Sequence, residues 1–393
     1  MPNSLDLPQI NLQKNKLISE TKIVVAMSGG VDSSVVACLL KKLGYQVIGI
    51  TLQLYDHGEA LKKKNACCAG VDIYDAKKVA EKFDFPHYVL NYQNLFQEKV
   101  IDDFADSYLR GETPIPCVKC NQNVKFQDLL QVARDLGADY MATGHYVKKI
   151  INKNNASELH QAVDPLKDQS YFLFATTKEQ LDFLCFPLGD YHKDFTRKLA
   201  EEFGIEVANK PDSQDICFVP NGDYASVIKK HRPNAFKQGD IIHIATQKIL
   251  GKHDGIINFT LGQRRGLGIA YENPLYVIKI DSITNRVFVG EEDFLYQQIF
   301  TLRDCNWLID IDFEKNLPTQ EFATYEPKNL NFQAEIRIRS SGSNYPASIE
   351  ILSPTTAKIT MKSLTRAITK GQAGVIYEGT RVLGGGWIDE VIS

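Results

Sequence analysis

The stretch that decides the fold is 21–34, TKIVVAMSGGVDSS, which is followed at once by VVACLLKKLG at 35–44. Residues 23–26 have the composition of a buried strand, whereas those from Ser33 onward repeat with the period of a helix. Between them stand two glycines and several small hydroxyl residues. Glycine permits backbone angles closed to other residues and lets a ligand approach main-chain N–H groups. The turn therefore predicts an anion held against the backbone, at the positive end of the following helix.

Strand and helix patterns alternate from this turn to about Tyr146. Strand-like runs at 22–27, 45–52, 86–92 and 139–145 are separated by helix-like runs at 33–44, 71–83, 94–109 and 123–137. Such alternation predicts an α/β fold with a parallel sheet that is covered by helices on both faces. Ligands of these sheets bind beyond the carboxyl ends of the strands, and SGGVDSS lies at such an end.

A different pattern begins after about Asn221, where the helical period fades and short β-rich segments are broken by Gly, Asn or Asp. In 331–340, NFQAEIRIRS, apolar and polar residues alternate, which predicts a half-buried strand with Arg337 and Arg339 on its outer face. The segment 147–160 predicts a hairpin. We expect three domains: a catalytic domain over 1–221, a small β-rich domain over 222–292 and a C-terminal β-barrel over 293–393.

Composition limits the class of protein. The 393 residues are 44% hydrophobic and 24% charged, the balance of a globular protein, with a net charge of −3. The chain is therefore not a polycation, although local basic patches could still hold one folded RNA. No apolar run is long enough for a bilayer, and residues 1–20 lack a secretory core, so we expect a cytoplasmic protein without membrane contact. The eight cysteines should then be reduced, with Cys38 and Cys185 filling apolar stretches.

The glycine turn has neither the spacing of a Walker loop nor the GxGxxG of dinucleotide folds. Asp32 suits a ligand to the Mg²⁺ that accompanies a triphosphate. SGGVDSS resembles the pyrophosphate loop of the ATP pyrophosphatases. That resemblance implies cleavage of ATP between the α and β phosphates and adenylation of a substrate oxygen. Its members include amide ligases and RNA-thiolating enzymes, so the loop alone leaves the substrate open.

The sequence around two cysteines favours a thiolating enzyme over an amide ligase. Cys120, within GETPIPCVKCNQNVKF at 111–126, precedes a predicted helix and follows Lys119, and both features favour the reactive thiolate. Cys217, within KPDSQDICFVPNGDY at 210–224, follows a polar turn. An alternative is that Cys117, Cys120 and Cys217 hold a [4Fe-4S] cluster with one open iron position. Four-ligand zinc fits less well, because no second CxxC is nearby.

Six blocks together resemble one family, the tRNA-specific 2-thiouridylases. They are AMSGGVDSS at 26–34, TPIPCVKCN at 113–121 followed by VKF, ATGHY at 142–146, KDQSYFLF at 167–174, KPDSQDICF at 210–218 and FTLGQRRGLGI at 259–269. The resemblance runs from Lys22 nearly to the end of the chain. It implies replacement of O2 of the wobble uridine by sulfur, with ATP and Mg²⁺ as cofactors and no separate metal site.

The resemblance also implies roles for residues. Cys120 matches the nucleophile, Cys217 the cysteine that carries a persulfide, and the two would form a transient disulfide; Asp32 would act at the nucleotide. The implied ATP site comprises Ala26, Met27, Ser28, Gly29, Gly30, Val31, Asp32, Ser33, Leu52 and Gly144. The implied tRNA contacts are Ile115, Pro116, Cys117, His145, Lys167, Asp168, Gln169, Arg337, Arg339 and Gln372. The family often has Asn at position 115 and Asp at position 117, so the contacts to the target base are the least secure.

The implied partners are wobble-uridine tRNAs for Lys, Glu and Gln, and a sulfur-relay protein or cysteine desulfurase. Two other classes of function stay open at this point. A small-molecule amide ligase would share the ATP loop, but would need neither cysteine and would leave the barrel unexplained. An iron–sulfur or zinc RNA-binding protein would release no AMP or pyrophosphate.

Overall fold

A computed structural model of the chain describes residues 10, 12, 16–54, 70–206, 210, 216–219, 222–311 and 330–392. Residues 211–215 of the KPDSQDICF block, and Cys67 and Cys68, lie outside this part. The chain divides into two compact units. The first unit comprises the residues up to Lys99 together with Cys120–Gly222, and the second comprises Val100–Lys119 together with the residues from Asp223 onward.

The first unit is built on a five-stranded sheet in which neighbouring strands run parallel. In spatial order its strands are β3 (His87–Asn91), β2 (Gln46–Gln53), β1 (Lys22–Ala26), β4 (Tyr140–Thr143) and β7 (Leu184–Cys185). Ala26 is level with Ile50 of β2 and with Thr143 of β4. The turn after β1 therefore leaves the sheet at its carboxyl edge. It lies next to the point where the chain order reverses, between β1 and β4.

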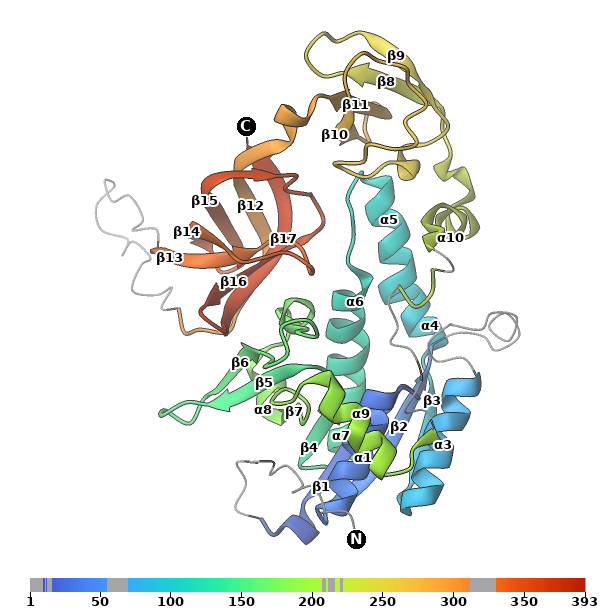
Figure 1. Cartoon of the computed structure of the whole chain (residues 1–393), viewed down its shortest axis with the longest axis vertical. Coiled ribbons are helices and arrows are strands. Elements are labelled where there is room, and N and C mark those ends of the chain that lie inside the picture. The colour runs from blue at the N-terminus through green and yellow to red at the C-terminus, as the bar shows by residue number, and fades with distance from the viewer. Residues whose placement is uncertain are drawn as a thin grey trace, which may run out of the picture. The chain divides into compact units, whose positions relative to one another are not determined.

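Helices cover this sheet and share one apolar core with it (Figure 1). Side chains of α1 (Val31–Lys42), α3 (Gly70–Phe83) and α9 (Lys193–Glu202) pack there against β1 and β2. The other helical segments of the unit are η1 (Ile18–Glu20), α4 (Gln93–Phe96), the π-helix η3 (Cys120–Leu129), α7 (Leu130–Asp135), η4 (Ser170–Leu173) and α8 (Lys178–Phe183). A second π-helix, η2 (Gln97–Asp102), spans the division between the units. The predicted hairpin is present as β5 (Val147–Ile151) and β6 (Ser157–Gln161).

The second unit contains a small sheet and a barrel. The sheet has the order β10 (Tyr276–Asp281), β11 (Arg286–Gly290), β8 (Gly239–His243) and β9 (Ile249–His253). The helical segments of the unit are α5 (Asp103–Leu109), α6 (Pro116–Lys119), α10 (Tyr224–His231), η7 (Pro233–Ala235), η8 (Ile256–Asn258) and η9 (Glu292–Leu295). Arg232 joins α10 to α5 through ion pairs with Asp102 and Asp106.

The barrel is a closed circuit of antiparallel pairings (Figure 1). Around the circuit its strands are β12 (Tyr296–Trp307), β15 (Thr356–Arg366), β14 (Tyr345–Ser353), β13 (Leu330–Arg337), β16 (Ala373–Glu378) and β17 (Arg381–Ile392), and β17 pairs again with β12. Alternate residues point inward, among them Phe300, Ile336 and Ile376, each fully buried. The predicted strand at 331–340 is β13 and its continuation.

The fold class predicted from the sequence is confirmed: a parallel α/β sheet is followed by a small β domain and a β-barrel. All four predicted strands of the sheet are present within a residue or two of their expected ends. In the described part of the chain, every helix is too short or too polar to span a membrane.

The core of the first unit provides a matched test of the packing. We expect Leu39→Ala, in α1 and fully buried, to lower the free energy of unfolding by about 2–5 kcal/mol, because the cavity adds to the lost transfer energy. Leu166→Ala, at a side chain that is 90% exposed, should stay within about 0.5 kcal/mol of the unchanged protein. Urea unfolding followed by helical circular dichroism measures both. Equal losses would contradict the assigned core.

Candidate active site

The glycine turn after β1 is held against helix α3. Gly29 is buried and has φ +73°, and a Cβ at this position would lie 2.1 Å from the carbonyl oxygen of Asp72. No side chain other than hydrogen fits there, and the backbone angle also favours glycine. The main chain of the turn therefore carries no side chain at Gly29, on the side that faces the start of α3.

Hydroxyl groups organise the rest of the turn. The N–H of Ser28 donates to Oγ of Ser33 over 3.1 Å, and the two serine Oγ atoms lie 3.3 Å apart. Helix α1 begins at Val31, and no side chain caps it at Gly30. The first N–H groups of a helix have no intrahelical acceptor and carry a partial positive charge. The turn thus gathers hydroxyl and N–H donors of the kind that bind a phosphate.

The carboxylate of Asp32 is engaged by helix α9. Nζ of Lys193 lies 2.7 and 2.8 Å from the two Asp32 oxygens, with the lysine side chain only 6% exposed and that of Asp32 30% exposed. The Tyr146 hydroxyl lies 2.9 Å from Asp32 Oδ1 and 2.8 Å from Oγ1 of Thr196. No local sequence pattern indicates this network, because Lys193 is 161 residues from Asp32.

A second lysine also contacts the turn. Nζ of Lys210 donates to the Gly29 carbonyl over 3.3 Å, to Asp75 over 3.0 Å and to Asp72. Burial alone would lower the pKa of Lys210, but its hydrogen bonds to Asp72 and Asp75 outweigh burial and raise it. The group stays a cation at neutral pH. Lys210 is the first residue of the KPDSQDICF block, but the sequence pattern predicts no role for it.

The remaining predicted nucleotide residues lie at the ends of neighbouring strands. Leu52 is buried in β2, and Met27 is buried directly after β1. Gly144 follows β4, and a Cβ there would lie 2.8 Å from the backbone nitrogen of Ser33. The close approach of the β4 end to the start of α1 accounts for glycine at this position. The sheet thus brings the predicted residues around the glycine turn to one edge.

Cys120 differs from expectation in its surroundings. The helical segment begins at Pro116, so Cys120 is not the first residue of a helix. The Cys120 thiol is free and buried, and burial raises its pKa, while the charge of Lys125 opposes that rise. Lys119 does not supply this charge; its Nζ lies 4.9 Å from the ring of Trp387. The prediction that a helix N-terminus and Lys119 favour the thiolate of Cys120 is therefore wrong, and Lys125 is the cation that acts on it.

The neighbourhood of Cys120 continues into side-chain contacts. Nζ of Lys125 donates to Oδ1 of Asn121 over 3.0 Å, and the Asn121 amide donates to the carbonyl of Phe172 over 3.3 Å. Burial, followed by the charge of Lys125, lowers the pKa of His145 to about 3, so its ring is neutral at pH 7. Its Nδ1 lies 2.9 Å from Oγ1 of Thr143. Any contact of His145 with RNA would then be a hydrogen bond and not an ion pair.

The other cysteines fall into two groups. Cys38 and Cys185 are buried in the core as predicted, and burial raises their pKa values to about 12 and about 11. Cys217 is half-buried beside Phe218, whose ring packs edge-on against Phe96, and Cys117 is exposed. Across the described residues, no group of three or more His, Cys, Asp or Glu side chains is arranged to hold a metal ion.

Two predicted tRNA residues of the first unit have structural partners. The Asp168 carboxylate accepts from the N–H groups of Ala162 and Ser170 and from the Ser170 hydroxyl. Gln169 exchanges two hydrogen bonds with the backbone of Tyr146, at 2.9 and 3.0 Å. Lys167, next to them, is half-buried. These residues therefore fix the loop that follows β6, and their contact with RNA stays a prediction.

Predicted tRNA residues of the second unit are also engaged. Arg337 donates to Asn344 and lies over the ring of Tyr377, while Arg339 donates to the Ala367 carbonyl over 2.7 Å. The Gln372 amide donates to the Thr113 carbonyl over 2.9 Å. The last two of the predicted residues, Ile115 and Pro116, are both buried.

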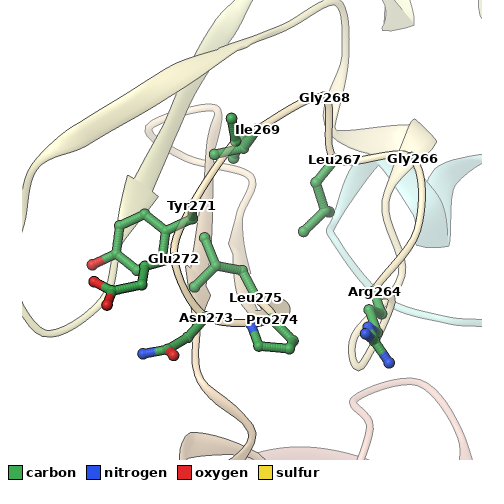
Figure 2. A pocket seen from close by; sticks show the side chains of 11 residues that line it. Arg264, Gly266, Leu267, Gly268, Ile269, Tyr271, Glu272, Asn273, Pro274 and Leu275 are labelled. Atoms are coloured by element: carbon green, nitrogen blue, oxygen red, sulfur yellow. The ribbon is translucent and has the colours of Figure 1, made fainter.

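A pocket of about 540 Å³ opens along residues 264–275 of the second unit (Figure 2). Arg264 stands at one end of it and Tyr271, Glu272 and Asn273 at the other. The Tyr271 ring stacks on His243 with 5.3 Å between centroids. None of the predicted ATP-site residues or cysteines lines this pocket.

Comparison with protein families gives three adjoining matches. Residues 21–221 match the profile described as a tRNA methyl transferase HUP domain, which covers more than half of the chain. Residues 225–291 match a tRNA methyl transferase PRC-barrel domain, and residues 298–388 match an aminomethyltransferase beta-barrel domain.

Relatives match over nearly the full length. The tRNA-specific 2-thiouridylase MnmA of Rickettsia conorii is 58% identical over 374 residues, which cover 95% of this chain and 96% of that protein. The protein of the same name from Rickettsia bellii is 59% identical over 371 residues, 94% of this chain and 96% of that protein. Among solved structures, a 4-thiouridine synthetase–RNA complex with bound ATP is 16% identical, with a TM-score of 0.35, and covers 54% of this chain and 50% of that one.

The Gly29 contact predicts a difference between adjacent glycines. Gly29→Ala should lower the free energy of unfolding of the first unit by about 3 kcal/mol or more, because backbone atoms of Asp72 occupy the space. Gly30→Ala should cost less than about 1 kcal/mol, since its nearest neighbour would be Ser28 Oγ at 3.5 Å. Urea unfolding measures both, and equal costs would show that α3 does not press on the turn.

The environment of Cys120 predicts a pH dependence. Alkylation by iodoacetamide requires the thiolate, so its midpoint at Cys120 should lie above the ordinary value of 9.0. Lys125→Met should move the midpoint to still higher pH, because a charge that favours the thiolate is lost. Lys125→Arg keeps that charge and serves as the control. Peptide mass spectrometry across a pH series reads the midpoint, and a downward shift in Lys125→Met would contradict the assignment.

Proposed function

Because this chain belongs to the tRNA-specific 2-thiouridylase family, we propose that it replaces O2 of the wobble uridine of tRNA with sulfur at the expense of ATP. The observation that carries the proposal is the grouping of the chemical parts. The glycine turn, Cys120 and Cys217 all belong to the first unit, within the span that matches the HUP-domain profile.

The glycine turn supplies the activation step. A uracil C2 oxygen is a poor leaving group until it attacks the α-phosphorus of ATP and displaces pyrophosphate. In this proposal, the N–H groups at the start of α1 and the hydroxyls of Ser28 and Ser33 stabilise the charge on the phosphates; their grouping at one turn supports that role. The Asp32 carboxylate would hold the Mg²⁺ of the nucleotide if it exchanged its contact with Lys193 for the ion, which would offset charge on the departing pyrophosphate.

Two thiols then complete the reaction. The terminal sulfur of a persulfide on Cys217 attacks C2, and AMP leaves with the original oxygen. The Cys120 thiolate attacks Sγ of Cys217 and breaks its bond to the transferred sulfur. The products are the 2-thiouridine, whose sulfur keeps the electron pair of that bond, and a Cys120–Cys217 disulfide. An external dithiol must reduce this disulfide, and a persulfide donor must reload Cys217, before the next turnover.

The partners follow from this chemistry. We propose wobble-uridine tRNAs, such as those for Lys, Glu and Gln, as substrates in the cytoplasm, and a sulfur-relay protein or a cysteine desulfurase as the donor. The barrel, residues 293–393 in our division, is proposed to bind the tRNA. Arg337 and Arg339 of β13 and its continuation offer guanidinium groups for phosphates.

A reconstituted assay tests the proposal. The purified protein is given a wobble-uridine tRNA transcript, ATP, Mg²⁺, a persulfide source and a dithiol. We expect 2-thiouridine, AMP and pyrophosphate in equal amounts. Cys120→Ser and Cys217→Ser should each lower the rate at least about 10³-fold, as loss of an essential nucleophile does. Cys305→Ser, at a barrel cysteine without a proposed role, is the control and should keep wild-type activity.

Other outcomes of this assay would identify other functions. ATP turnover that needs no tRNA and is retained in both cysteine variants, with no 2-thiouridine formed by the unchanged protein, would support an amide ligase and overturn thiolation. Methylated tRNA formed from S-adenosylmethionine would favour the activity that the family profiles name. Iron and sulfide analysis of anaerobically purified protein tests the cluster alternative, and a metal-free protein that thiolates tRNA would exclude it.

A further inference from the structure

The structure of the second unit assigns a role to a turn of the barrel. We propose that residues 367–372, the barrel turn, position residues 112–119, the approach segment that leads directly into Cys120. Gln372 is then a positioning residue of the reaction as well as a predicted tRNA contact. The inference rests on the proposed function for its catalytic meaning, whereas its structural part concerns contacts within the second unit.

The barrel turn forms hydrogen bonds with both backbone polar groups of Thr113. The N–H of Thr113 donates to the Lys370 carbonyl over 2.9 Å. The carbonyl of Thr113 accepts from the side-chain amide of Gln372, also over 2.9 Å. Two hydrogen bonds to one residue fix its position and its orientation, as strand pairing does in a sheet.

Gly371 packs directly on the same place. It has φ +86°, and a Cβ on it would lie 2.8 Å from Cβ of Glu112 and 2.9 Å from the Thr113 nitrogen. The barrel turn can lie this close to the approach segment because position 371 has no side chain. The two hydrogen bonds of Thr113 depend on that approach.

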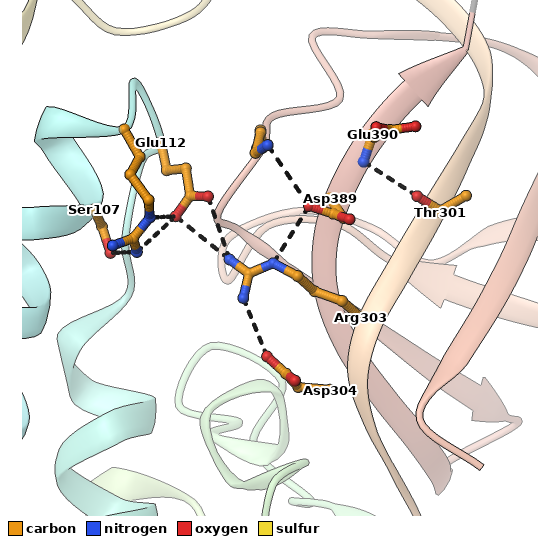
Figure 3. A network of polar contacts seen from close by, with 9 residues as sticks. Ser107, Glu112, Thr301, Arg303, Asp304, Asp389 and Glu390 are labelled. Carbon is orange, nitrogen blue, oxygen red and sulfur yellow. Dashed lines mark hydrogen bonds and ion pairs between the residues drawn. The ribbon is translucent and has the colours of Figure 1, made fainter. Parts of the chain in front are cut away.

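Glu112 anchors the start of the approach segment. Its side chain is 5% exposed, and its Oε2 accepts from Arg110 Nε and Nη2 at 3.3 and 3.1 Å. Nη2 of Arg303, from β12, lies 3.3 and 3.4 Å from the two carboxylate oxygens (Figure 3). Arg303 also pairs with Asp389 of β17. A buried carboxylate is costly without such partners, so Glu112 is tied to the barrel wall.

The other end of the approach segment is held as well. The ammonium of Lys119, the residue before Cys120, lies 4.9 Å from the ring of Trp387 in β17. The barrel turn itself is fixed to the barrel, because Arg339 donates to the Ala367 carbonyl. Gly371 N donates to Ile388, and Ile388 N donates to Gln372.

These contacts give Gln372 a function that a simple tRNA contact would lack. Its amide donates to a backbone carbonyl seven residues before Cys120. Any change at Gln372 is therefore transmitted to the approach segment, and through the continuous chain to the cysteine. The barrel would thereby couple the binding of its RNA to the position of the thiol.

Single-turnover kinetics separate positioning from binding. For Gln372→Ala and Gln372→Glu, which cannot donate to Thr113, we expect the thiolation rate at saturating tRNA to fall about five- to tenfold, the loss expected for one hydrogen bond. The dissociation constant for tRNA is measured separately by filter binding without ATP. A rate at saturating tRNA equal to that of the unchanged protein would overturn the proposal, whatever the change in affinity.

Hydrogen exchange tests the contacts without relying on activity. Gly371→Ala should speed exchange of the Thr113 amide about tenfold or more, because its Cβ would push the barrel turn away. Gly379→Ala is the matched control: it lies in the β16–β17 turn with φ +57° and nothing within 4 Å, so it adds the backbone strain alone. Equal exchange of Thr113 in the two variants would overturn the inference. Absence of thiolation by the unchanged protein would instead defeat the proposed function and leave this measurement decisive.

Discussion

The space above Gly29 is occupied by the backbone of Asp72, and the candidate site depends on this contact. The carbonyl oxygen of Asp72 stands where a side chain at position 29 would begin, so helix α3 closes over the glycine turn. Gly144 approaches the start of α1 with similar closeness. The turn is thereby fixed by three elements, β1, α3 and the end of β4, and its donors would need little rearrangement to meet the phosphate that we propose there. Such preorganisation is the main source of electrostatic catalysis.

The charges around the turn are arranged in pairs that join distant segments. Lys193 pairs with Asp32, and Lys210 pairs with both Asp72 and Asp75. Lys193 is 161 residues from Asp32 and Lys210 is 138 residues from Asp72, so closing the site requires the later parts of the first unit. A polyphosphate at the turn would compete with these carboxylates for the same ammonium groups. Each lysine already lies within hydrogen-bonding distance of the turn or of its first helical residues. Either ammonium group could therefore exchange its carboxylate partner for a phosphate oxygen of the ligand.

The fold could be predicted from the sequence because it depends on local patterns. The alternation from Lys22 to Tyr146 gave every strand of the sheet except β7, a strand of only two residues, Leu184–Cys185. The glycine turn was equally readable, since Gly29 and Gly30 stand between a strand and a helix. The ionic partners were not readable, because Lys193 and Lys210 have no local pattern that marks them. The setting of Cys120 was mispredicted for a similar reason: Pro116 starts the helix earlier, and burial decides the pKa of the thiol.

The closed circuit of β12–β17 has a consequence for how this protein can evolve and interact. Because β17 pairs again with β12, the barrel presents no unpaired edge along that seam to another chain. Along that seam, recognition of a partner depends on loops and outward side chains, which can change without disturbing the hydrogen-bonded wall. The same closure makes the wall cooperative, since opening one seam would expose two rows of unsatisfied amides at once. The barrel should therefore resist domain swapping while leaving its rim free to diversify.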